Sequence, residues 1–112
     1  MTLFEWLLVG HLVGDYLLQT RWMAEKKVNM WPPLLVHGAV YTAAVTLLAL
    51  LAGRLLPLSA IALIFFSHIF LDNRFFVEFW TKKVTRAENT EWLKIMVDQT
   101  WHIVILALVT LI

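Results

Sequence analysis

The chain has 112 residues, of which 61% are hydrophobic and 15% charged, with a mean hydropathy of +0.76. Soluble domains average about 45–50% apolar and about 25% charged residues, so this composition excludes an ordinary soluble globular domain, which could not bury so much apolar surface at this length. The formal net charge of +1 argues against a nucleic-acid partner, and the absence of cysteine excludes disulfides and thiolate metal sites.

Long apolar runs that do not alternate in polarity predict transmembrane helices rather than a barrel. Each of the four runs in this chain is near the ~20 residues that cross a bilayer core; they cover about residues 3–20, 33–52, 56–80 and 91–112. We therefore expect an all-α polytopic membrane protein, one domain over residues 1–112 folded as an antiparallel bundle of four transmembrane helices. The first run lacks a basic leader, so we expect no cleaved signal peptide.

Basic residues gather in two of the three connections between these runs. The first and third connections hold Arg21, Lys26, Lys27, Lys82, Lys83 and Arg86, whereas the second holds only Arg54. By the positive-inside rule, both basic connections face the cytoplasm and both termini face outward. Tryptophans flank the same connections, as expected for an aromatic belt at the inner interface; they are Trp22, Trp31, Trp80 and Trp92.

Every aspartate in the chain lies four residues from a histidine. The pairs stand in HLVGD (His11 and Asp15), HIFLD (His68 and Asp72) and DQTWH (Asp98 and His102), and the remaining histidine is His37 in the second run. A spacing of four puts both members of a pair on one helix face. The order is reversed in the fourth run, which crosses the membrane in the opposite direction to the first and third. We therefore expect all seven side chains at similar depth.

These residue types predict a metal site. A carboxylate inside a membrane costs about 2.5–3.5 kcal/mol, so the aspartates must face the bundle interior and find partners. Imidazoles and carboxylates without thiolates suit Zn²⁺, Mn²⁺ or Fe²⁺. We predict one or two ions, with zinc favoured, and the candidate ligands are His11, Asp15, His37, His68, Asp72, Asp98 and His102.

Four polar residues beside these candidates are predicted to orient the ligands or a substrate; they are Gln19, Asn73, Arg74 and Gln99. Gly10 and Gly14 bracket His11 at a spacing that lets two membrane helices approach closely, and Gly38 follows His37. We expect this close approach between the first and second helices.

Together these motifs resemble a family of small bacterial inner-membrane proteins classed as a domain of unknown function. The resemblance covers nearly the whole chain and rests on HLVGDYLLQ, RWMAEKK, the lone His37, SHIFLD and DQTWH. It implies a multi-pass protein of the bacterial inner membrane. The histidine–aspartate pattern is also similar, more distantly, to membrane-bound proteins described as metal-dependent hydrolases, which implies hydrolysis.

The function we predict is a metal-dependent hydrolase that acts on a lipid or lipid-linked substrate near the cytoplasmic surface. A bound ion would lower the pKa of a bound water molecule towards neutrality. The candidate catalytic carboxylates are Asp98, Asp15 and Asp72, with Asp98 as general base. Arg74 or Arg21 could hold a phosphate group.

Other functions are compatible with the same residues. The same cluster could serve a divalent-metal or proton transporter, because intramembrane His and Asp residues form ion pathways. Few polar residues occur in the outer halves of the second and fourth helices, which favours an enzyme over a transporter. Haem binding by paired histidines and a purely structural role are further alternatives. Because so short a chain buries few contacts per helix, we also consider a homodimer.

Overall fold

The computed structural model describes residues 1–112 and consists of helices and their connections, without strands. This confirms the predicted all-α class. The elements are α1 (Leu3–Leu12), the π-helix η1 (Val13–Leu17), α2 (Arg21–Lys26), α3 (Trp31–Leu51), α4 (Leu58–Asp72), α5 (Phe75–Lys83) and α6 (Glu91–Val109).

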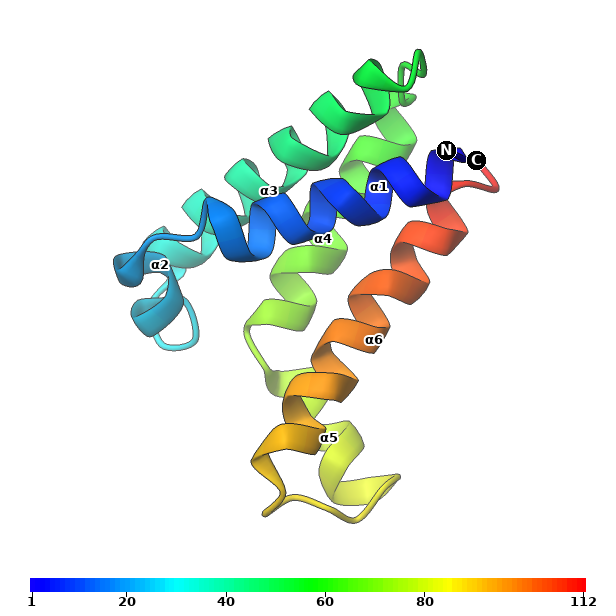
Figure 1. The fold of residues 1–112 in the computed structure, drawn as a ribbon. Coiled ribbons are helices and arrows are strands. Elements are labelled where there is room, and N and C mark those ends of the chain that lie inside the picture. Colours follow the sequence, from blue (N-terminus) through cyan, green and yellow to red (C-terminus); the bar gives the residue numbers. More distant parts are fainter.

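Four helical segments enclose the centre of the molecule, and we call them the long helices: α1 with its continuation η1, α3, α4 and α6. Helix α3 packs against α1 and α4, α4 packs against α6, and α6 returns to contact α1. Figure 1 shows α1 and α3 side by side, and it shows the two chain termini close together at one end. The short helix α2 lies at the ends of α1 and α3 that are far from the termini, and α5 lies at the corresponding ends of α4 and α6 (Figure 1).

Two helices, α3 and α6, are long and apolar enough to cross a membrane, and α4 with α5 would make a third span if the bent pair crosses as one. These helices indicate a membrane protein. The segment that the sequence predicts as the first span holds ten α-helical and five π-helical residues, fewer than the ~20 residues that a full crossing needs. The structure therefore supports two or three spans directly.

The first predicted helix changes character where its polar residues begin. After Leu12 the chain forms a π-helical turn, in which the backbone N–H of Leu18 donates to the carbonyl of Val13 at 3.0 Å. Such turns accommodate an extra residue and occur often at functional sites. The turn carries Asp15 and ends at Leu17, so Gln19 lies beyond the helix rather than on it.

The third predicted helix is broken at Asn73 and Arg74. Helices α4 and α5 meet at an angle of 61°, and Arg74 adopts a left-handed backbone conformation with φ 68°. The Asn73 side chain accepts a hydrogen bond from the backbone N–H of Phe75 at 2.8 Å. This bond ties the Asn73 side chain to the backbone at the start of α5, a common use of asparagine beside a helix. Its role in orienting the ligands or a substrate stays a prediction.

The hydrophobic core lies on the side of the bundle where the termini meet. It consists of Leu7, Tyr41, Val45, Ala49, Leu56, Ala60, Ile64, Leu106 and Val109, all buried. On each long helix, the core residues lie between that helix's histidine and the end of the bundle where the two chain termini meet. The core therefore closes one end of the polar region described below.

Glycine allows α1 and η1 to pack directly on α3. A Cβ atom on Gly10 would lie 2.8 Å from the Cα of Val45, and one on Gly14 would lie 3.1 Å from the Cα of Tyr41. Both neighbours are backbone atoms, which cannot move aside without shifting the helix. The close approach expected from the glycine spacing is thus present between these elements.

We predict that Gly10→Ala destabilises the fold. Overpacking costs about 1–3 kcal/mol, which exceeds the gain of up to about 1 kcal/mol from replacing glycine by alanine within a helix. Gly38→Ala is the matched control, because its nearest neighbour is the flexible Cγ1 of Ile69 at 3.1 Å. Unfolding in detergent measures both variants, and equal stability of the two would contradict the prediction.

Candidate metal centre

Seven side chains form one buried cluster, which we call the His–Asp cluster. Neighbouring imidazole nitrogens and carboxylate oxygens lie between 3.1 and 3.9 Å apart. Asp98 is partly exposed and the other six are buried. The members are His11 on α1, Asp15 on η1, His37 on α3, His68 and Asp72 on α4, and Asp98 and His102 on α6. The structure thus brings all seven candidate ligands together.

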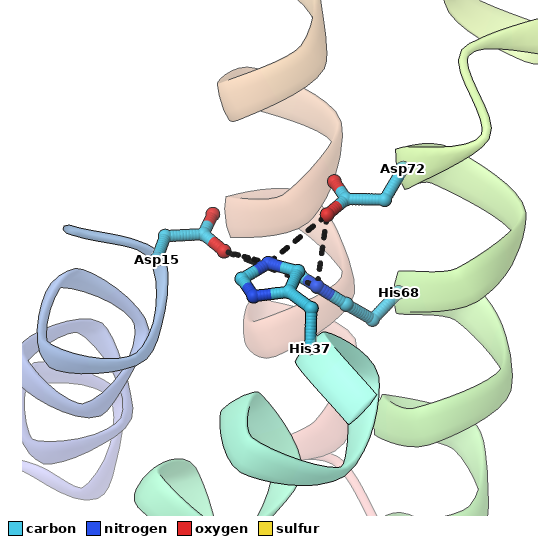
Figure 2. A group of neighbouring side chains, drawn as sticks. All are labelled: Asp15, His37, His68 and Asp72. Atoms are coloured by element: carbon cyan, nitrogen blue, oxygen red, sulfur yellow. Dashed lines mark hydrogen bonds and ion pairs between the residues drawn. The ribbon is translucent and has the colours of Figure 1, made fainter. Parts of the chain in front are cut away.

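Four members offer ligand atoms to a common point. One atom each from Asp15, His37, His68 and Asp72 lies within 4.8 Å of the other three. Figure 2 shows Asp15 approaching from η1, His37 from α3, and His68 and Asp72 from α4. We call these residues the primary group.

The spacing within the primary group suits a small cation. The Nε2 atom of His37 lies 3.1 Å from an oxygen of Asp15 and 3.1 Å from one of Asp72. The Nε2 atom of His68 lies 3.1 Å from Asp72 and 3.9 Å from Asp15. Bond lengths of about 2.0–2.1 Å around a tetrahedral zinc ion imply ligand–ligand distances of about 3.3–3.4 Å. The primary group could therefore hold an ion with small adjustments.

A second group shares Asp72 with the first. Asp72, Asp98 and His102 also offer ligand atoms within 4.8 Å of one another. The Nδ1–H of His102 donates to the backbone carbonyl of Asp98 at 2.7 Å, so a neutral ring presents the lone pair of Nε2, which lies 3.2 Å from Asp72. A hydrogen bond from the other ring nitrogen is the usual way in which metal-binding histidines are oriented.

Several buried ring nitrogens in the cluster lack hydrogen-bond partners. They are Nδ1 of His37, both ring nitrogens of His68, and Nε2 of His102. Two of them, Nε2 of His68 and Nε2 of His102, lie within 3.2 Å of Asp72 oxygens without hydrogen-bond geometry. A lone pair facing a carboxylate is favourable only with a proton or a cation between them. Neutral His68 could supply that proton from its own Nε2–H, whereas His102, whose Nδ1–H already donates to Asp98, would need an added proton or a bound cation.

His11 differs from the other three histidines. Its Nε2–H donates to Gln99 Oε1 at 2.8 Å, and its Nδ1 accepts from the hydroxyl of Tyr41 at 2.8 Å; this tautomer follows because the amide oxygen can only accept. Both ring nitrogens are thus occupied, and His11 belongs to neither of the two groups that could hold an ion. Although the sequence predicts a ligand here, the structure has His11 positioning Gln99 and Tyr41.

The two predicted glutamines lie beside the cluster. Gln19 donates to the backbone carbonyl of Asp15 at 2.9 Å, and Gln99 donates weakly to Asp98 at 3.4 Å. Each amide thus bridges a cluster aspartate to a further polar group. Arg74 is half-buried and makes no side-chain hydrogen bond or ion pair.

Two residues of the site escape the sequence analysis. The Lys27 ammonium, beyond the end of α2, donates to Asp72 and to Gln19 at 2.7 Å each. The ring of Tyr41 stacks on that of His68 with centroids 3.9 Å apart. Tyr41 lies four residues after His37, which is the same spacing that identifies the histidine–aspartate pairs. Lys27 has no such signal, because it stands next to Lys26 in a loop whose basic residues already mark topology.

The formal charges of the cluster call for two compensating positive charges. Three carboxylates and the Lys27 ammonium leave a charge of −2 when the histidines are neutral. Uncompensated charge in a buried site is strongly unfavourable. One divalent cation, or two protons, would neutralise it.

A polar cavity leads to the cluster between η1 and α6. It has a volume of about 190 Å³, and both Asp15 and Asp98 line it, together with Lys27 and Arg74. The exposed side chains of Tyr16 and Ile95 also line this cavity. The cluster is therefore accessible from one side, opposite the hydrophobic core.

Comparison with known sequences identifies the family. A family model described as "Protein of unknown function (DUF3307)" matches residues 3–112. No curated protein and no solved structure matches the chain significantly. Because the family model covers all but the first two residues, the chain belongs to the DUF3307 family of proteins of unknown function.

Proposed function

We propose that this protein is a metal-dependent membrane hydrolase that acts on a lipid or lipid-linked substrate through the His–Asp cluster. The observation that carries the proposal is the pair of buried nitrogens, on His68 and His102, that face Asp72 oxygens at 3.1 and 3.2 Å without hydrogen bonds. A divalent cation between imidazole and carboxylate would satisfy these atoms and offset the charge of −2. Zinc suits the donor set best, and manganese or iron would also fit.

The arrangement around the candidate ion site suits hydrolysis. A divalent cation held there would activate a water molecule and polarise a phosphoryl or acyl oxygen. Asp98 is the cluster carboxylate placed to act as general base, because it lies outside the primary group and lines the cavity through which water and substrate would enter. Asp15 and Asp72 would hold the ion.

An enzyme fits the packing better than a transporter. The nine core residues close the end of the bundle beyond the cluster, and the void between the two, which His68, His102 and Ile64 line, is too small for a water molecule. An ion pathway through the molecule would need polar side chains there. A site open on one side matches a catalyst that exchanges substrate and product with one membrane leaflet.

We place the cavity near the cytoplasmic face of a bacterial inner membrane, in a chain with four crossings and both termini outside. The positions of the basic connections support this orientation, and Trp22, Trp31 and Trp92 beside them are exposed. In this arrangement α1, η1 and the residues on either side of them would together form the first membrane crossing. Labelling of single cysteines, introduced into this cysteine-free chain, would test the orientation.

We predict about one equivalent of divalent metal per chain in protein purified without a chelator or a nickel column. His68→Ala removes a ligand of the primary group and loses the ion, whereas His11→Ala retains it at saturating metal because both His11 nitrogens are already hydrogen-bonded. Elemental mass spectrometry measures both. A metal-free wild-type protein, or equal metal in wild type and His68→Ala, would contradict the metal site and favour a proton relay.

We also predict hydrolysis of a membrane lipid by the metal-loaded protein, detected by mass spectrometry of the products from a bacterial lipid extract. Asp98→Asn should lower the rate by about 10²-fold or more, the usual contribution of a general base, while the ion stays in the primary group. Glu88→Gln is the control, because Glu88 is exposed and lines a separate cavity that no member of the His–Asp cluster lines. Undiminished hydrolysis by Asp98→Asn would remove Asp98 from the mechanism.

A further inference from the structure

We infer that Arg74, assisted by Lys27, forms an anion subsite at the mouth of the His–Asp cluster and that this subsite takes the phosphate group of a phosphoester. The inference rests on the proposed function and specifies its substrate class. It starts from a charged side chain for which the folded chain supplies no partner.

Arg74 is the half-buried cation that the fold leaves without a partner, whereas other unpaired cations such as Arg54 and Arg86 are exposed. The residue is half-buried and its side chain makes no hydrogen bond or ion pair within the chain, yet it lines the polar cavity beside Asp15 and Asp98. Arg21, the other arginine predicted to hold phosphate, is ion-paired to Glu25 at 2.9 Å, and its side chain is 85% exposed. The structure therefore distinguishes the two candidates and favours Arg74.

The backbone at Arg74 shows that its position is unusual. A φ of 68° is uncommon for a residue other than glycine, asparagine or aspartate. This conformation occurs at the break between α4 and α5, two residues after Asp72. The same break that ends the ligand-bearing helix thus brings a cation to the cavity.

Lys27 supplies a second cation at the same cavity. Its ammonium donates to Asp72 and to Gln19, and an ammonium has three N–H donors. One donor remains for a ligand. The bonds to Asp72 and Gln19 also hold the ammonium in place, so it would not have to be ordered when an anion arrives.

The charge of the loaded site calls for an anion. The cluster with Lys27 has a formal charge of −2, and a divalent ion brings it to zero. Arg74 then leaves one positive charge facing the cavity, which a singly charged group would neutralise. Guanidinium binds phosphate through two parallel hydrogen bonds, and the tetrahedral arrangement of phosphate oxygens allows further bonds to Lys27 and to a metal ion from other directions.

The surroundings of the cavity suit a phosphate that carries an apolar chain. Tyr16 and Ile95 line the cavity and are 58% and 52% exposed, so they can contact an acyl or isoprenoid chain. Both free phosphate and a lipid phosphate share the chemistry that Arg74 recognises. The two sources differ in whether these apolar side chains add to the affinity.

The test is calorimetric titration of the full-length protein in detergent with inorganic phosphate and, separately, with dihexanoyl phosphatidic acid. Arg74→Asn removes the charge and introduces a residue that accepts positive φ. Arg86→Asn is a matched control, because Arg86 also has positive φ, at 52°, but is exposed and does not line the cavity. Arg74→Gly serves as a second variant should Arg74→Asn fold poorly.

We expect Arg74→Asn to bind both ligands about tenfold or more weakly than wild type, the effect of losing a charge-assisted hydrogen bond, with Arg86→Asn unchanged. Tighter binding of the lipid than of inorganic phosphate would identify a lipid source, and equal binding a free phosphate. Wild-type affinity in Arg74→Asn or Arg74→Gly, or no phosphate binding by wild type, would overturn the subsite.

Metal content, measured on each sample before titration, separates this inference from the proposed function. A protein that holds metal but binds phosphate independently of Arg74 would refute the subsite alone. A protein without metal would refute the proposed metal centre, and the same titration would still decide whether phosphate binding depends on Arg74.

Discussion

The buried carboxylate of Asp72 is the group on which the rest of the site depends. One of its oxygens lies within 3.1 Å of Lys27, His37 and His68, and the other lies 3.2 Å from His102. These nitrogens come from three helices and one connection, so a single carboxylate ties together segments that are distant in the sequence. A buried charge is tolerated only with such partners. Burying Asp72 therefore costs free energy, and the need to pair its carboxylate holds the helices and the Lys27 connection together around it.

Irregular backbone at two places makes this convergence possible. The π-helical turn places Asp15 opposite His37, and the break after Asp72 lets α5 turn away while Arg74 stays at the cavity. Gly14 contributes by allowing η1 to approach the backbone of Tyr41. Regular helices throughout would have been simpler to stabilise, since each departure leaves backbone groups or torsion angles less favourable. The departures are concentrated next to the groups that carry the chemistry.

The repeated spacing of four is the part of the site that the sequence predicts well. On an α-helix this spacing fixes which side chains share a face, and the reversed order of Asp98 and His102 matches the direction of α6. The all-helical class follows as directly, because the apolar runs are long and unalternating.

Other features depend on tertiary contacts that a one-dimensional pattern does not contain. The spacing rule assumes a regular α-helix, so it could not reveal the π-helical turn at Asp15. It could not separate His11, whose nitrogens are occupied by Tyr41 and Gln99, from the histidines with free nitrogens. The sequence does not distinguish Lys27 from its neighbour Lys26. Only in the folded chain does the Lys27 ammonium contact Asp72. These differences arise from which atoms meet, and they divide the seven expected ligands into the primary group of four, a second group that shares Asp72, and His11, which belongs to neither.

X-ray absorption spectroscopy at the edge of the bound metal, on tag-free protein, tests the central claim most directly. A centre built from the primary group should show only nitrogen and oxygen neighbours at about 2.0–2.2 Å, together with the multiple-scattering pattern of two coordinated imidazoles. A bound metal whose spectrum contains no imidazole scattering would place the ion elsewhere and contradict the account.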